Sequence, residues 1–256
     1  MGTKTTACIV THNNIKYIYR TVATLLEHTK GVDFTLYIVD NASTDGTIEL
    51  VEKEFGNEKN LKIIKTGRNI GFGAGHNIVL DLINSDYHCV VNPDIAIDDD
   101  IILKMADYME ENSDIGLLSP RICFPDGRDQ ILGKRDPKLH YLVGSRLRDD
   151  EDPNGWLVEY AMLNEDYSKP FDIENATGCF MFFRTKAFKS VGGFDKRYFL
   201  YFEDCDISRE ISKTSRVVFY PGAVVYHEWG RDSKRNFKLM AVHMKSMLSY
   251  FWKWRR

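Results

Sequence analysis

Four groups of polar residues follow short apolar runs in the first hundred residues. They contain more kinds of functional group than a turn requires. They bring together carboxylates, side-chain amides, hydroxyls and a guanidinium. An ordinary turn is also polar, but it need not repeat these groups at four successive positions. Together they are typical of a site that holds a polar ligand. The groups are Thr11–Asn14, Asp40–Ser43, Thr66–Asn69 and Asn92–Asp94.

The second group combines a carboxylate with the start of a helix. Ser43 or Thr44 is a natural N-cap for the helical pattern that follows, which accounts for the hydroxyls. Capping does not account for Asp40, which ends the apolar run before the cap. A carboxylate at that position can accept a hydrogen bond from the N3–H of uracil or thymine. We therefore interpret Asp40 as a nucleotide contact.

A glycine-rich segment follows the third apolar run and superficially resembles a dinucleotide-binding fingerprint. Its glycines, Gly71, Gly73 and Gly75, have the spacing GxGxG instead of GxGxxG, and the segment does not follow the first strand. Both departures argue against a nicotinamide- or flavin-dependent oxidoreductase. Glycine still lets the backbone approach a ligand or a neighbouring element closely.

The fourth group, Asn92-Pro93-Asp94, ends an apolar run in an amide, a rigid residue and a carboxylate. One carboxylate, with phosphate oxygens and waters completing the shell, is a usual way to hold Mg²⁺ or Mn²⁺. The alternative is an ordinary Asn-Pro-Asp turn. We interpret the nearby carboxylates Asp98–Asp100 differently, as capping of the next helix, because negative charge stabilises a helix N-terminus.

The elements that position these groups alternate between β-branched runs and segments with helical spacing. Such alternation predicts an α/β fold with a mostly parallel sheet and helices on both faces. Ligands of these sheets bind at the carboxyl ends of the strands, where the polar groups lie. We interpret the charged stretch 125–169 as an insertion that forms a lid or an acceptor loop. The predicted strands cover 7–10, 34–39, 61–64, 89–91, 115–118, 177–183 and 217–220, and the predicted helices cover about 15–26, 47–55, 74–83, 101–109 and 203–212.

Composition excludes several classes of protein. The 256 residues carry a net charge of −3, which argues against a globally basic nucleic-acid binder. No stretch reaches the roughly 18 apolar residues of a transmembrane helix. The five cysteines are an odd number and none stands in a CxxC pair, so we expect buried, reduced thiols instead of disulfides or a zinc site.

The order and spacing of these motifs resemble family 2 glycosyltransferases of the GT-A fold, particularly the rhamnosyltransferase-like branch. The resemblance runs from Ala7 to about Ser233. It implies one catalytic domain over 1–232, in which about 1–120 binds the nucleotide-sugar and about 121–232 binds the acceptor. The motifs are VDNASTDGT, RNIGFGAGHN, NPD, GCFMFFR, GGFDKRYFLYFEDCDISRE and the later His227.

The resemblance also implies roles for particular residues. It points to Asp204 as the general base, with Glu203 as its neighbour or alternative, and to Asp94 and His227 as ligands of Mn²⁺ or Mg²⁺. Plain helix-start charges are the alternative for the two carboxylates of 203–204. Trp229 and Tyr201 offer flat faces to acceptor sugar rings. The implied nucleotide-sugar contacts are Thr11, Asn13, Asp40, Asn41, Arg68, Asn69, Gly71, Asn92 and Asp94.

The expected activity is transfer of a sugar, with inversion, from a nucleoside diphosphate donor to a saccharide or polyprenol-linked acceptor in bacterial surface polysaccharide synthesis. By resemblance the first donor is dTDP-L-rhamnose, and a UDP-hexose or UDP-N-acetylhexosamine is the alternative. The alternative without catalysis is an inactive nucleotide- or sugar-binding module. Because Asp40, Asp94, Asp204 and His227 occur together, we favour the enzyme.

The last 24 residues, 233–256, form a basic amphipathic pattern. They contain seven Lys and Arg, no acidic residue, and many Phe, Trp, Leu and Met. Such a helix lies well at an anionic bilayer surface, so we expect peripheral attachment to the cytoplasmic face of the cell membrane. On this interpretation, removal of the segment spares donor hydrolysis. The alternative is that it packs on the catalytic domain or on a partner subunit, as in a homodimer.

Overall fold

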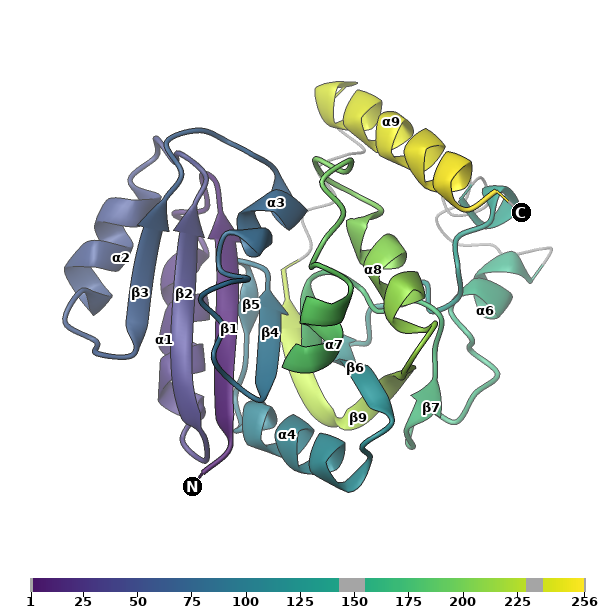
Figure 1. Cartoon of the computed structure of the whole chain (residues 1–256), viewed down its shortest axis with the longest axis horizontal. Coiled ribbons are helices and arrows are strands. Elements are labelled where there is room, and N and C mark those ends of the chain that lie inside the picture. The colour runs from purple at the N-terminus through teal and green to yellow at the C-terminus, as the bar shows by residue number, and fades with distance from the viewer. Residues whose placement is uncertain (1, 143–154, 229–236, 256) are drawn as a thin grey trace.

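The computed structural model describes residues 2–142, 155–228 and 237–255. These residues form one mixed sheet of nine strands with helices against both faces (Figure 1). The strand order is β3-β2-β1-β4-β8-β6-β9-β5, with β7 beside β9. The predicted α/β class is confirmed. The boundary expected near residue 120 falls inside a strand, and the one expected at 232 lies outside the described residues.

The N-terminal half of the sheet is parallel, as predicted. Three of its four strands are buried along most of their length because helices cover both faces, whereas β3, at the edge of the sheet, is more exposed. In the paired register Thr11 lies opposite Asp40, and Asp40 lies opposite Lys65. The carboxyl ends therefore meet along one edge, which brings the polar groups together. The strands are β1 (Lys4–Thr11), β2 (Asp33–Asp40), β3 (Leu61–Lys65) and β4 (Tyr87–Val91).

Two apolar clusters join the helices to the two faces of the sheet. One cluster holds α1 (Ile18–His28), α2 (Thr47–Phe55) and α4 (Ile101–Glu111). The other holds α7 (Thr185–Ser190) and α8 (Glu203–Ile211). All five cysteines are free and buried, as expected.

The predicted capping role of the carboxylates 98–100 is borne out at Asp100. Its Oδ1 accepts a hydrogen bond from the backbone N–H of Leu103, 3.1 Å away, in the first turn of α4. This bond satisfies one of the free N–H groups of the helix start.

Two predicted helix boundaries are wrong. The helix expected over 15–26 begins at Ile18, and Ile15 is 45% exposed, because the N–H of Ile15 is held by Asp45 in the neighbouring loop. The helix expected over 74–83 is the shorter α3 (Phe72–Asn77), followed by hydrogen-bonded turns. The glycines at its start lower its helix propensity, and close packing against residue 199 fixes where it begins.

The second half of the sheet contains antiparallel pairings that local patterns did not specify. Strand β8 (Phe180–Arg184) lies antiparallel between β4 and β6 (Ile115–Cys123), while β9 (Arg216–His227) runs parallel to β6. The unpredicted short strands β5 (Ile95–Ala96) and β7 (Phe171–Asp172) pair with β9. As a result, the start of β8 and the end of β4 lie together, and the Asn92 N–H donates to the Cys179 carbonyl at 2.8 Å.

The C-terminal helix α9 (Phe237–Lys253) packs on the rest of the described chain, in line with one of the two predicted alternatives. Figure 1 shows it running over the loop that precedes α8. Tyr250, on its inner face, is 1% exposed and contacts Phe202, and the Ser246 hydroxyl donates to the Leu200 carbonyl at 2.8 Å. Over the part of the chain that the structure describes, no helix is long and apolar enough to cross a bilayer.

Candidate functional site

One cavity of about 690 Å³ opens at the carboxyl edge of the parallel strands and extends toward α8 and α9. Most of the predicted site residues line it, although they come from distant parts of the sequence. The described parts of the 125–169 insertion, including Leu132, Leu142 and the α6 (Trp156–Tyr160) residue Tyr160, also line it. The predicted residues at its wall are Thr11, Asn41, Asn69, Gly71, Asn92, Asp94, Tyr201, Glu203, Asp204 and His227.

Three predicted contacts lie outside the cavity wall. Asn13 has left-handed backbone (φ 60°), and its side-chain oxygen accepts from the Thr44 N–H at 2.8 Å, so it joins two loops. Asp40 is buried behind the wall, where one of its carboxylate oxygens accepts from the Ser43 N–H at 3.0 Å. Arg68 is exposed. Trp229 lies outside the described residues.

Asp94 and His227 face each other because β5 pairs with the end of β9. His227 Nε2 lies 3.5 Å from Asp94 Oδ2, and both side chains are largely buried. Gln130, which the sequence did not single out, orients the ring. Its Nε2 donates to the His227 carbonyl at 2.6 Å, so its Oε1 is left to accept from Nδ1–H at 3.0 Å. The Nε2 lone pair therefore points toward Asp94.

This pair fits a divalent cation. Burial lowers the pKa of His227 to about 4, so the imidazole is neutral at pH 7, as a metal ligand must be. The hydrogen bond from Nδ1–H to Gln130 is the type of second contact that orients ligating histidines. Within the described ranges no third His, Cys, Asp or Glu joins the pair. Oxygen atoms of a ligand and water would complete the shell.

Asp204 is held rigidly at the start of α8. Its Oδ2 accepts from the Gly178 N–H at 3.0 Å, and its Oδ1 accepts from the Cys205 N–H at 2.9 Å. Burial nevertheless raises its pKa, because these hydrogen bonds offset only part of the desolvation. An oriented carboxylate with a raised pKa is suited to accept a proton.

The neighbouring carboxylate has a different environment. Burial, together with the charge of Asp204, raises the pKa of Glu203 well above its usual range. Its Oε2 is buried and has no hydrogen-bond partner among the described residues. Glu203 therefore favours the protonated form, and Asp204 is the better candidate for an anionic base.

A strained aromatic loop joins this carboxylate pair to the N-terminal half. Tyr201 and Phe202 both have left-handed backbone, with φ of 71° and 68°. The carbonyl of Phe199 accepts from the Phe72 N–H at 2.9 Å. A Cβ on Gly71 (φ 91°) would stand 2.3 Å from that carbonyl, so this position needs glycine to close the two halves together.

Several residues of the site were not assigned a role by the sequence analysis. Gln130 acts on His227, 97 positions away, and no local pattern marks it. Gly178 begins the GCFMFFR motif, but its contact with Asp204, 26 positions away, is not visible in the sequence. Leu239 and His243 line the cavity from α9, where the basic pattern pointed to a membrane instead. His12, which donates from Nδ1 to the Asn41 carbonyl at 2.8 Å, stood within the first polar group and could have been included.

Comparison with known proteins agrees with this architecture. The family model for glycosyl transferase family 2 matches residues 6–192. The N-acetylglucosaminyl-diphospho-decaprenol L-rhamnosyltransferase of Mycobacterium tuberculosis is 27% identical over 244 residues, which cover 83% of this chain and 72% of that protein. The rhamnosyltransferase WbbL of Escherichia coli is 25% identical over 255 residues, covering 94% of this chain and 90% of that protein.

Among solved structures, the mannosyltransferase PcManGT from Pyrobaculum calidifontis, in complex with GDP-Man and Mn²⁺, has the same fold. The TM-score is 0.66 at 15% identity, and the match covers 98% of this chain but 65% of the solved one. The predicted GT-A fold is thus confirmed. Because the family model also covers most of the sequence, the chain belongs to glycosyl transferase family 2 and is a glycosyltransferase.

Proposed function

We propose that this glycosyltransferase moves L-rhamnose from dTDP-L-rhamnose to a saccharide on a lipid-linked acceptor, with inversion at the anomeric carbon. The observation that carries the proposal is the meeting of Asp204, held by the Gly178 N–H, with the Asp94–His227 pair in one cavity. The choice of sugar and acceptor is supported by the two relatives, whose names specify rhamnose and, for one, a diphospho-decaprenol acceptor.

The donor is expected to lie along the polar wall that Thr11, Asn41 and Asn69 form at the strand ends. Asp94 and His227 would hold Mn²⁺ or Mg²⁺, which neutralises a leaving diphosphate. A solved structure of the same fold contains Mn²⁺, which supports this cofactor. Asp40 lies next to this wall, and its second carboxylate oxygen is proposed to accept from the N3–H of the base.

Asp204 acts on the acceptor. Its carboxylate takes the proton of the acceptor hydroxyl while that oxygen bonds to the anomeric carbon. The bond between the anomeric carbon and the phosphate oxygen breaks, and its electron pair leaves with the diphosphate. One displacement of this kind inverts the anomeric centre. A positioned base contributes a factor of about 10²–10⁴ to the rate.

The exposed outer face of α9 is suited to bind a membrane surface. Met240, Met244, Leu248 and Trp252 recur every fourth residue and so share one face. Leu248 and Trp252 are 64% and 61% exposed. The exposed cations of this helix, with no acidic residue among them, would each contribute about 1 kcal/mol beside anionic lipid. We propose that this face rests on the cytoplasmic membrane surface, near lipid-linked acceptors.

The test is turnover with a panel of donors and a saccharide–diphosphate–lipid acceptor. We expect transfer from dTDP-L-rhamnose with Mn²⁺ or Mg²⁺, and loss of nearly all transfer in excess EDTA and in Asp94→Ala. Asp126→Ala, in an exposed turn, is the matched control. Full activity in EDTA would contradict the metal role. Preference for a UDP-hexose or UDP-N-acetylhexosamine would overturn the choice of donor, and binding without turnover would indicate an inactive module.

A further inference from the structure

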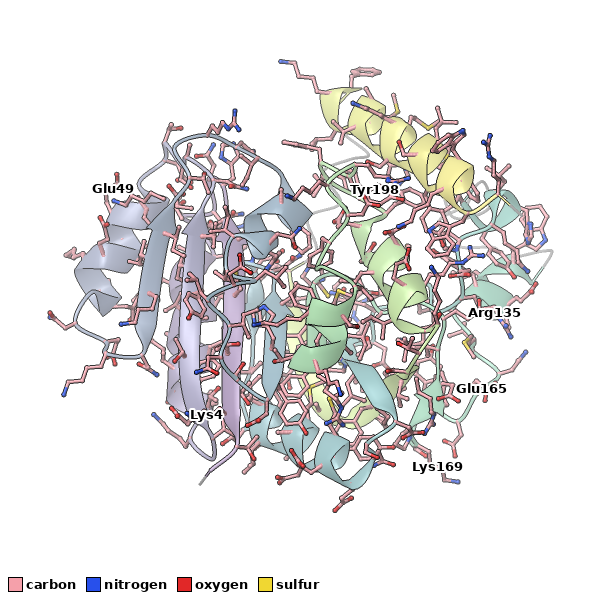
Figure 2. The ribbon with its side chains drawn as sticks, viewed as in Figure 1. Lys4, Glu49, Arg135, Glu165, Lys169 and Tyr198 are labelled. Atoms are coloured by element: carbon pink, nitrogen blue, oxygen red, sulfur yellow. The ribbon has the colours of Figure 1, made fainter. Side chains whose placement is uncertain are left out.

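A buried carboxylate connects α8 to the C-terminal helix. The side chain of Asp206, on α8, is 2% exposed and lies two residues after Asp204. Its Oδ2 accepts from Lys253 Nζ at 2.8 Å, and its Oδ1 accepts from Trp254 Nε1 at 2.8 Å. The Tyr198 hydroxyl also donates to Oδ1, at 3.1 Å, from the loop before α8 (Figure 2). Asp206 thus ties together a helix, a loop and the chain's last described residues.

Lys253 is the centre of this connection. Besides Asp206, its ammonium lies 3.1 Å from an oxygen of Asp195 and 3.0 Å from an oxygen of Glu210. It is 18% exposed, so it interacts with the three carboxylates in a partly desolvated setting, where charge pairs are stronger than at an open surface. Asp195 also pairs with Arg197, and Glu210 with Lys213, so Asp206 is the carboxylate that pairs with Lys253 alone among the described residues.

The same helix reaches the cavity at its other end. Leu239 and His243 line the cavity wall, and His243 packs on the rings of Tyr201 and Phe202. These two residues have the left-handed backbone that leads directly into Glu203 and Asp204. A conformation of this kind costs about 1–3 kcal/mol and persists only where neighbours hold it in place. Helix α9 supplies those neighbours.

We propose that α9 is a working part of the active site, in which Lys253 and Trp254 act through Asp206 to hold α8 where Asp204 meets the acceptor hydroxyl. They are positioning residues, since neither is among the residues that line the cavity. The inference rests on the proposed function, because it takes Asp204 as the base. It also reverses the expectation that removal of the C-terminal segment spares the chemistry.

The charge of Lys253 gives the inference a measurable consequence in the pH dependence of kcat. Removing the ammonium of Lys253 takes away the cation paired with Asp206, whereas Asp195 keeps Arg197 and Glu210 keeps Lys213. The buried negative charge of Asp206, two residues from Asp204, then disfavours ionisation of Asp204. The acid limb of the kcat–pH profile should then move to higher pH. The other titratable groups that face Asp204 are Glu203 and Cys205 on α8, Cys179 before β8, and Tyr160 on α6, and none of them changes in this variant.

The experiment compares the full-length variants Lys253→Met, Lys253→Arg and Trp254→Phe with the wild type. We expect Lys253→Met to lower kcat at least tenfold, to leave the KM for the donor within twofold, and to move the acid limb of kcat upward. Lys253→Arg should keep the acid limb at its wild-type pH, because arginine keeps the positive charge. Lys186→Met, at an exposed position of α7, is the control and should behave as the wild type.

The outcomes separate this inference from the proposed function. If the wild type transfers sugar, and a folded Lys253→Met variant has wild-type kcat and pH profile, the inference fails alone. If the wild type transfers no sugar, the proposed function fails. If circular dichroism shows that Lys253→Met is unfolded, Trp254→Phe provides the test of the inference. This variant removes one hydrogen bond to Asp206 and keeps the charge of Lys253. It should lower kcat with the acid limb unmoved, and unchanged kcat would overturn the inference.

Discussion

Replacement of Asp204 by asparagine tests the proposed chemistry most directly. The amide has the shape of the carboxylate but cannot take the proton of an acceptor hydroxyl. Loss of a positioned base lowers the rate by a factor of about 10²–10⁴. We therefore expect kcat to fall at least a hundredfold. The affinity for the donor should change little, because the proposed donor contacts lie on the wall formed by the strand ends.

The structure also predicts the effect of this change on stability. Both oxygens of Asp204 accept backbone N–H groups, from Gly178 and Cys205. An asparagine can offer its oxygen to one of them, so the other faces an NH₂ group. An unsatisfied buried donor costs about 1–3 kcal/mol. Burial already penalises the ionised carboxylate, as its raised pKa indicates, so we expect the lower end of this range, about 1 kcal/mol or about 2–4 °C in Tm.

The assay measures kcat and KM for transfer, donor affinity by calorimetry and Tm by circular dichroism. Asp126→Asn controls for the loss of a carboxylate at an exposed position. An Asp204→Asn protein that is folded, binds donor and retains more than about a tenth of wild-type kcat would refute Asp204 as the base, since that loss is far smaller than a missing base produces. A Tm equal to the wild type would refute the hydrogen-bond reasoning.

Three further predictions follow from other parts of the molecule. Asp40 should make UDP and dTDP bind far better than CDP, because cytosine lacks the N3–H that a buried carboxylate accepts, and equal affinities by calorimetry would contradict this. Leu248→Glu with Trp252→Glu should reduce co-sedimentation with anionic vesicles, whereas loss of a dimer instead would identify the outer face of α9 as a subunit contact. Burial lowers the pKa of His88 to about 3, so only the unfolded chain takes up this proton as pH falls from about 6.5 toward 3. The free energy of unfolding should decrease by about 1.4 kcal/mol per pH unit from this histidine, and a His88→Asn variant with the wild-type slope would refute the assignment.

The sequence by itself determined the N-terminal half of the fold and the position of its polar edge. Strands such as 34–39 are apolar almost throughout, and in helices such as 101–109 apolar residues recur every three or four positions, so local periodicity reveals them. Parallel strands end at one edge, which places Thr11, Asn41 and Asp94 in one region without further information. Asp204 and His227 could be connected to that region only through resemblance to a family.

Tertiary structure decided which side chains act together. The antiparallel insertion of β8 beside β4 places the Gly178 N–H against Asp204, and the pairing of β5 with β9 sets His227 against Asp94. Strand partners and registers depend on contacts between residues far apart in the chain, which a local pattern does not encode. The role of α9 was undecided for the same physical reason. Its basic, apolar sequence suits lipid and protein equally. The face that turns inward is shown by the burial of Tyr250 and by the carboxylates around Lys253, which come from distant parts of the chain.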